Sequence, residues 1–398
     1  MGSELRWDPY DVDIFANPYP YLRRLREEAP VYYNEQYDFY AVSRFEDVER
    51  CLSNRDIFLS RFGVVLEHVK RRQSFPLPFF IFQDPPIHTA YRGLVTRIFT
   101  PAKMNALQGQ IRAYCANALD PLIGTGKFDF VRDLGAEMPM RVIGMLLGIP
   151  EPELKTVQKG VASEKKRIKP GQPQPPPQYG SFTESLSDYV DWRIKNPSDD
   201  LTTTLINAEF VDERGVKRKL MREEVIAYCN LFAGAGNEST NGLIGWTGKV
   251  LGEHPDQRRQ IYENRALIPQ AIEEVLRYEP PGGVCVARFV AEDIELHGVK
   301  IPKGSSLACL NGSANRDDRR FVEGDKFNIH RERLSHLSFG VGFHACVGNA
   351  LARVEARIAL DEILNRFPEW ELDMSSASML PSTTTRGWNS VPTFTQSA

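Results

Sequence analysis

Residues 339–348 read FGVGFHACVG and place one cysteine, Cys346, among glycines directly before an amphipathic segment. Four apolar residues of that segment follow the spacing of a buried helical stripe: Val347, Leu351, Val354 and Ile358. A cysteine at the amino terminus of a helix meets the positive end of the helix dipole, which favours the thiolate, and a thiolate is a metal ligand. The glycines allow the backbone to turn sharply and to approach a large planar group. The pattern makes Cys346 a candidate metal ligand.

The chemistry of Cys346 leaves three interpretations open. A single cysteine cannot build a structural zinc site, which needs four protein ligands, but it can hold a haem iron because the porphyrin supplies the other four nitrogens. The alternatives are a structural cysteine at a glycine-rich turn and a nucleophile that works with a distant histidine. Spacing alone favours the structural cysteine.

Composition narrows the class of protein. The 398 residues carry a net charge of -3, and 42% of them are hydrophobic, which is typical of a globular protein without nucleic-acid binding. The first residues, MGSELRWDPY, lack a cationic region followed by an apolar run, and no apolar stretch reaches membrane-spanning length. Six scattered cysteines without a CxxC pair suit a reducing compartment. We expect one cytoplasmic domain, residues 1–398.

The longest predicted helix runs from Met221 to Leu251 and ends before His254-Pro255, because the residue preceding a proline avoids helical geometry. Its centre, residues 233–240, reads AGAGNEST. Each glycine inside a helix costs roughly 1 kcal/mol, so a compensating role is expected. Taken alone, close helix packing is the favoured role. The alternative is a backbone cleared for a flat ligand, with Glu238, Ser239 and Thr240 beside it.

Shorter elements surround these two segments. A helix predicted at Ile268 to Tyr278 carries Glu274 and Arg277 on one face, a pair that is common on exposed helices. Alternation after it predicts a small sheet with Arg288 near its start and a hairpin turn at His297-Gly298. Near the amino terminus we predict four elements, a helix, two strands and a helix: Pro20 to Ala29, Val31 to Tyr33, Phe39 to Val42, and Phe45 to Leu52. Two long loops are predicted, Ser60 to Gln83 and the proline-rich Lys169 to Tyr179.

Several of these motifs together resemble one family. FGVGFHACVG resembles the haem-binding signature of cytochrome P450, with Cys346 in the place of the iron-ligating cysteine. AIEEVLRYEPP resembles the ExxR helix of that family, and AGNEST resembles its central-helix motif. DPPIHTAYR resembles a haem-contacting region, while SANRDDRRF and RGWNSVP are similar to the soluble bacterial branch. In order and spacing, the resemblance covers nearly the whole chain.

The resemblance implies a mainly α fold with small β-sheets, a roughly triangular single domain with haem between the long central helix and the helix after the cysteine loop. The cofactor implied is haem b (iron protoporphyrin IX), with Cys346 as the ligand of its metal. The ExxR pair would form a buried structural network behind it. The remaining cofactor-binding residues implied are four partners of the haem propionates and one residue of the central helix: His88, Arg92, Arg288, His344 and Ala235.

The reaction implied is monooxygenation, in which two electrons and two protons split dioxygen, one atom enters a C-H bond and the other leaves as water. It would hydroxylate or oxidatively dealkylate a small hydrophobic molecule, and Glu238, Ser239 and Thr240 are the catalytic residues implied for proton delivery. The family usually has threonine where this chain has Ser239, and serine lacks the methyl group that fixes the rotamer. Two alternatives stay open, a peroxide-driven haem peroxygenase and a non-enzymatic haem sensor.

The resemblance also implies partners. Electrons would come from a ferredoxin and an NAD(P)H-dependent ferredoxin reductase, docked by charge complementarity near Arg92, Arg97 and Arg333. Neither nucleic acid nor membrane is expected to bind. The substrate pocket is predicted to be walled by four largely apolar segments: Phe75 to Phe82, Ala233 to Gly236, Gly282 to Val286, and Thr383 to Trp388.

Overall fold

The fold is that of a computed structural model, which describes residues 5–72, 75, 79–154, 171–172, 179–332, 335–380 and 385–395, with residues 179–185 described by backbone only. Most of the proline-rich segment 169–179 lies outside these ranges. So do Arg333 and residues 383–384 of the expected pocket wall. Within the described residues, no helix is both long and apolar enough to cross a membrane.

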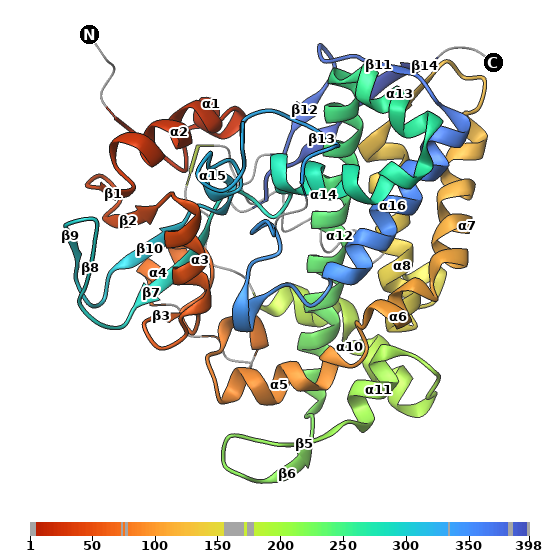
Figure 1. The fold of residues 1–398 in the computed structure, drawn as a ribbon. Coiled ribbons are helices and arrows are strands. Elements are labelled where there is room, and N and C mark those ends of the chain that lie inside the picture. The colour runs from red at the N-terminus through yellow and green to blue at the C-terminus, as the bar shows by residue number, and fades with distance from the viewer. Residues whose placement is uncertain are drawn as a thin grey trace.

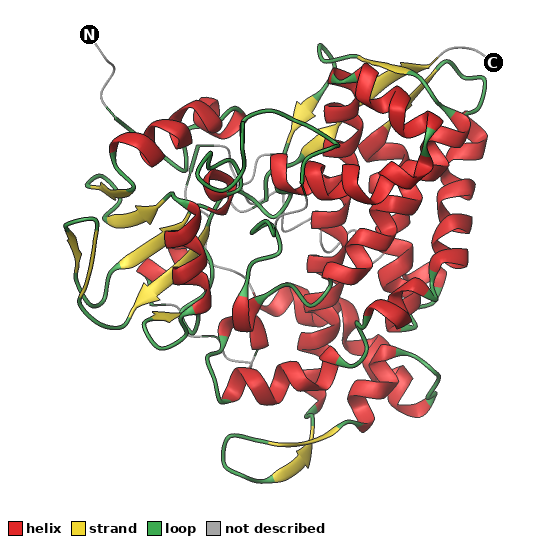
Figure 2. Ribbon diagram, viewed as in Figure 1, coloured by secondary structure: helices red, strands yellow, loops and turns green. Residues whose placement is uncertain are grey.

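Helices form the larger part of the molecule, and the five-stranded sheet lies with the β8–β9 hairpin on the opposite side (Figures 1 and 2). The α-helices are α1 Val12–Ala16, α2 Tyr19–Glu28, α3 Phe45–Ser53, α4 Leu66–Lys70, α5 Ile87–Thr96, α6 Pro101–Asn105, α7 Gln108–Leu119, α8 Met138–Leu147, α10 Tyr179–Lys195, α11 Leu201–Asn207, α12 Arg222–Glu253, α13 Pro255–Glu263, α14 Ile268–Tyr278, α15 Asn311–Ala314 and α16 Asn349–Arg366. Short 3-10 or π turns are η1 Phe80–Phe82, η2 Asp120–Leu122, η3 Phe130–Gly135, η4 Arg265–Leu267 and η5 Gly342–His344.

The strands form one five-stranded sheet and several small ones. They are β1 Val31–Asn34, β2 Phe39–Val42, β3 Phe58–Leu59, β4 Lys127–Asp129, β5 Glu209–Val211, β6 Lys217–Lys219, β7 Val286–Val290, β8 Ile294–Leu296, β9 Val299–Ile301, β10 Ser306–Cys309, β11 Trp370–Leu372, β12 Ser378–Met379, β13 Trp388–Ser390 and β14 Pro392–Thr395. The main sheet has the order β1-β2-β10-β7-β3, in which only the β2-β10 pair is parallel. Arg288 of β7 lies opposite Leu307 of β10, in the interior of this sheet.

Helix α12 is the axis of the helical part. Its 32 residues span about 48 Å, since an α-helix rises 1.5 Å per residue. It packs against η3, α8, α10 and α16 and buries Trp246, whose indole N-H donates to the carbonyl oxygen of Arg386 at 2.9 Å. The helix ends at Glu253, with His254 as its C-cap residue directly before Pro255, so it stops where the sequence predicts.

Most predicted elements are confirmed, and the mainly α class with small sheets is confirmed with them. Helix α14 has the predicted bounds, and the four elements near the amino terminus agree within one residue. The turn at His297-Gly298 joins β8 to β9 with φ angles of 49° and 77°. The long, partly ordered loop predicted from Ser60 to Gln83 contains two short helices that the sequence did not indicate, α4 and η1. These helices, of 5 and 3 residues, are too short to give a periodic apolar pattern.

Candidate functional site

The cysteine loop turns sharply at two glycines. Gly340 and Gly342 have φ angles of 65° and 71°, the left-handed region that glycine adopts without strain. A Cβ at Gly342 would also lie 3.1 Å from the Cα of Ser53, too close for a side chain. The backbone N-H of Cys346 donates to the carbonyl oxygen of Phe339 at 2.7 Å, which closes the loop just before α16. Of the six cysteines, all free, only Cys346 is exposed.

The surroundings of the Cys346 thiol shift its pKa in two opposite directions. Protein atoms surround it on most sides although the residue keeps an exposed surface, and this burial raises the pKa of the thiol. Opposing it, the backbone N-H groups of Gly348 and Asn349 and the cations of Arg92 and Arg353 favour the thiolate. A bound metal cation removes the thiol proton outright, so these groups suit a metal-bound sulfur.

The small residues at the centre of α12 have two separate roles. A Cβ at Gly236 would lie 2.5 Å from Cδ1 of Ile143, so Gly236 allows α8 to pack closely. At Gly234 an added Cβ would meet no described atom within 4 Å outside its own helix backbone, and Ala235 is exposed although Phe232 and Leu243 are buried. Gly236 therefore confirms the close-packing interpretation, and the two positions before it, Gly234 and Ala235, leave the open space beside the helix that the flat-ligand interpretation requires.

A cluster of nitrogen donors lies beside the cysteine loop. The rings of His88 on α5 and His344 are 4.3 Å apart, and neither ring nitrogen of His88 has a hydrogen-bond partner among the described residues. Burial, with the cation of Arg92 nearby, lowers the pKa of His88 to about 4, and burial with the cations of Arg288 and Arg92 lowers that of His344 to about 3. Both rings are therefore neutral at pH 7, and each has one N-H to donate. His344 already forms a hydrogen bond with the backbone of Gln83, so His88 is the ring whose N-H has no partner among the described residues.

Two arginines complete this cluster. Arg288 is 3% exposed, and burial lowers its pKa. Arg92 donates to the carbonyl oxygen of Ala345, so it contacts the cysteine loop while part of its side chain stays exposed. The negative charge of Asp84 raises the pKa of both Arg288 and His88, but this carboxylate already accepts a hydrogen bond from Nε of Arg61 at 2.7 Å. The cluster therefore has positive charge that the one nearby carboxylate does not fully neutralise, and ring nitrogens of His88 without a partner among the described residues. Both features suit an anionic group.

The polar residues of α12 point in different directions. The Ser239 hydroxyl donates to the carbonyl oxygen of Ala235 at 2.9 Å, one turn back along the open side. Thr240 is 2% exposed, and its hydroxyl donates to Oε2 of Glu355 on α16 at 3.5 Å. Glu238, directly before Ser239, is partly buried. The two neighbouring hydroxyls are therefore not interchangeable.

Glu355 is a candidate functional residue that the sequence reasoning missed. It is 1% exposed, its Oε1 has no partner among the described residues, and burial raises its pKa well above the ordinary value. Burial therefore favours the protonated, neutral form of this acid. A signal existed, because Glu355 follows Leu351 by four residues and so lies on the predicted buried stripe of α16.

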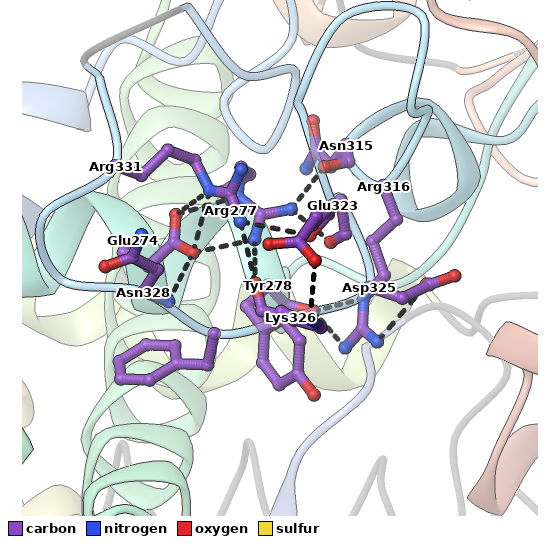
Figure 3. A network of polar contacts seen from close by, with 12 residues as sticks. Glu274, Arg277, Tyr278, Asn315, Arg316, Glu323, Asp325, Lys326, Asn328 and Arg331 are labelled. Carbon is purple, nitrogen blue, oxygen red and sulfur yellow. Dashed lines mark hydrogen bonds and ion pairs between the residues drawn. The ribbon is translucent and has the colours of Figure 1, made fainter. Parts of the chain in front are cut away.

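The ExxR pair is buried, which corrects the interpretation as an ordinary exposed pair and confirms the buried network that the resemblance implied (Figure 3). Glu274 and Arg277 form two parallel hydrogen bonds of 2.7 and 2.8 Å. Arg277 also donates to the carbonyl oxygens of Asn315 and Gly324 at 2.7 Å each, and Arg331 donates to Glu274 at 3.0 Å. The network ties α14 to the chain that leads into the cysteine loop.

Comparison with known proteins decides the family. The family model for cytochrome P450 matches residues 181–387. A putative cytochrome P450 123 of Mycobacterium tuberculosis is 35% identical over 99% of this chain and 98% of its own length. The chain belongs to the cytochrome P450 family. Cytochrome P450 109 of Bacillus spizizenii is 33% identical over 87% of this P450 and 84% of its own length.

Solved structures agree. Cytochrome P450 CYP109Q5 from Chondromyces apiculatus has a TM-score of 0.86 at 31% identity, covering 98% of this chain and 99% of its own. A mutant of P450 EryK in complex with erythromycin B has a TM-score of 0.85 at 28% identity, covering 97% of each chain. This P450 is therefore a monooxygenase of the cytochrome P450 fold, and its family uses haem.

The residues present fit a haem. Two buried groups suit the propionates of a haem: the ring of His88, whose nitrogens have no partner among the described residues, and the guanidinium of Arg288, which makes few hydrogen bonds. The open side of α12 at Ala235 leaves room for a flat group. These predicted residues come from four separate segments, α5, α12, β7 and the cysteine loop. The structure brings His88 against His344 and Arg92 against the cysteine loop, as expected for one shared ligand.

Proposed function

We propose that this P450 holds haem b through Cys346 and hydroxylates, or oxidatively dealkylates, a small hydrophobic molecule. Electrons come from a ferredoxin and an NAD(P)H-dependent ferredoxin reductase. The observation that carries the proposal is the combination of the one exposed cysteine with an adjacent donor cluster that includes unpartnered His88. When bound, the haem supplies dioxygen activation, and a thiolate ligand favours cleavage of the O-O bond.

The chain's own residues hold the cofactor in complementary ways. Cys346 supplies the iron ligand, and the N-H groups of Gly348 and Asn349 stabilise its negative charge. Neutral His88 would donate to a propionate, His344 would support it from 4.3 Å away, and Arg92 and Arg288 would neutralise the propionate charges. Gly234 and Ala235 leave the space in which substrate and dioxygen meet the cofactor.

Proton delivery is assigned to Ser239 together with Glu238. Ser239 lies on the open side of α12, where its hydroxyl donates to the carbonyl oxygen of Ala235 and is ready to rotate toward a new acceptor. Thr240 faces α16 instead, and its hydroxyl proton is used in the hydrogen bond to Glu355, on the side of α12 away from the open space. Glu355 thereby positions Thr240 and keeps this side of α12 neutral.

Ser239→Ala is expected to increase the hydrogen peroxide released per NAD(P)H consumed, because oxygen reduction then proceeds without the hydroxyl that places the proton. The measurement is peroxide and product yield during turnover with a ferredoxin system. The matched control is Thr240→Ala, expected to change this ratio less. If coupling is unchanged in Ser239→Ala and falls in Thr240→Ala, Thr240 carries the proton instead.

Glu355→Gln is expected to change how stability depends on pH. Because burial raises the folded-state pKa of Glu355, the native chain keeps a proton that the unfolded chain releases above about pH 4.5. The stabilising contribution of Glu355 is thus full below that pH and falls as pH rises toward its folded-state pKa. Glutamine does not titrate, so the variant should gain stability relative to the parent protein between pH 5 and pH 8 in urea unfolding. Exposed Glu371→Gln is the control; parallel curves for all three proteins would refute a neutral Glu355.

The hydrophobic substrate class is inferred from an aromatic cluster packed beside α12. Phe80 is 2% exposed, and its ring centroid lies 5.9 Å from that of Tyr228 and 6.5 Å from that of Phe232, both on α12. Phe75 and Phe82 stack at 4.0 Å in the same loop. Among solved relatives, P450 EryK was crystallised with erythromycin B and CYP109E1 of Bacillus megaterium with testosterone. A terpenoid, steroid or aromatic compound is the substrate class proposed here.

The experiment that tests the function is the carbon monoxide difference spectrum of the reduced protein. A strongly red-shifted Soret band supports thiolate-bound haem. Hydrophobic compounds are then screened for displacement of iron-bound water and for hydroxylated product. Product with a ferredoxin system supports the proposal, whereas product with hydrogen peroxide alone would identify a peroxygenase.

A further inference from the structure

A chain of polar contacts reaches the cysteine loop from α16. Asn349, the first residue of α16, donates through Nδ2 to the carbonyl oxygen of Cys346 at 2.6 Å. Its backbone N-H also favours the Cys346 thiolate. Asn349 therefore contacts both the backbone and the sulfur of the residue proposed to bind iron.

Arg353, one turn further along α16, fixes the orientation of the Asn349 amide. Its Nη1 donates to Oδ1 of Asn349 at 2.9 Å, and this contact leaves Nδ2 as the group that faces Cys346. The guanidinium also lies 4.5 Å from the ring centroid of Phe339, whose carbonyl oxygen accepts the N-H of Cys346. Arg353 thus contacts one end of the hydrogen-bonded loop at Phe339 and is linked to the other end, Cys346, through Asn349.

Glu273 of α14 holds Arg353 in place. Nε and Nη2 of Arg353 donate to the two carboxylate oxygens of Glu273 at 2.6 and 3.0 Å, a two-bond geometry that only arginine provides. His336 contacts the same carboxylate at 3.3 Å. Although burial raises the pKa of Glu273, hydrogen bonds from His336 and Arg353 outweigh it and lower that pKa to about 2. Glu273 is therefore charged at neutral pH and remains paired.

We propose that Arg353, held by Glu273, is a positioning residue for Cys346: it orders the cysteine loop through Asn349 and Phe339 and places a positive charge that stabilises the iron-bound thiolate. The inference rests on the proposed function, since it needs Cys346 as the iron ligand. A charge near a metal ligand changes the reduction potential of the metal. The groups that hydrogen-bond to the ligand determine how firmly the ligand is held. Loss of the cation should therefore lower the potential, and loss of the tether should loosen the thiolate.

The test separates charge from tether in the haem-loaded protein. Arg353→Gln removes both and should lower the midpoint potential while making conversion of the red-shifted carbon monoxide form to the neutral-thiol form roughly tenfold faster. Arg353→Lys keeps the charge, so its potential should stay near that of the parent protein while conversion is faster. Glu273→Gln should speed conversion without lowering the potential, because a negative charge is lost.

Arg357→Gln is the matched control, since it removes the same charge one turn further along α16. Arg353→Gln indistinguishable from Arg357→Gln in both measurements would overturn the inference and leave the haem assignment intact. A parent protein that shows no red-shifted band would overturn both.

Discussion

Cys346→Ala is expected to abolish the red-shifted Soret band of the reduced carbon monoxide complex and to reduce hydroxylation to background. Alanine offers no ligand for the iron, and no other cysteine of the chain is exposed. The thiolate also supplies the electron density that favours O-O cleavage, so haem retained by other contacts would not restore activity. This change tests the central assignment because it removes one sulfur from the surface of a loop and leaves the packed core in place.

Two variants control this experiment. Cys285→Ala removes a partly buried cysteine from another segment and should keep the band. His344→Ala should also keep the band but bind haem 10- to 100-fold more weakly, a typical effect of removing a group that supports a cofactor site. An unchanged spectrum in Cys346→Ala would contradict the assignment of the iron ligand.

Arg277→Ala is expected to cost about 3 to 5 kcal/mol of folding free energy, because it leaves Glu274 buried without its main partner. Folded proteins are stable by only about 5 to 15 kcal/mol, so little folded holoprotein should accumulate. The measurement is the free energy of unfolding in urea, or the soluble yield when unfolding is not reversible.

The control for this second change is a surface pair. Lys217 and Glu209 are 70% and 53% exposed, and Lys217→Ala should cost less than about 1 kcal/mol. Arg277→Lys should rescue only part of the loss, because lysine cannot form the two parallel bonds to Glu274. Equal stability of Arg277→Ala and Lys217→Ala would contradict a structural role for the buried network.

The sequence predicted correctly those helices and strands that are determined by neighbouring residues along the chain. Helix α14 has a full apolar periodicity, and α12 ends at a proline, so both agree with the structure. Burial of the Glu274 and Arg277 pair could not be read from spacing, because it depends on carbonyl groups about 38 and 47 residues further along the chain. Glu355 and Arg353 were missed for the same reason: their partners lie on α12 and α14, and only the packed helices bring them together.

The two glycines of α12 differ in how far they can be substituted in a redesigned protein. Substitution at Gly236 would push α8 away through Ile143, so this position has almost no mutational freedom. Gly234, only half a turn away, has free space, and alanine there would even favour the helix by up to about 1 kcal/mol. Under the proposed function, Gly234 and Ala235 are therefore positions at which substitution should reshape the substrate space without moving the neighbouring helices.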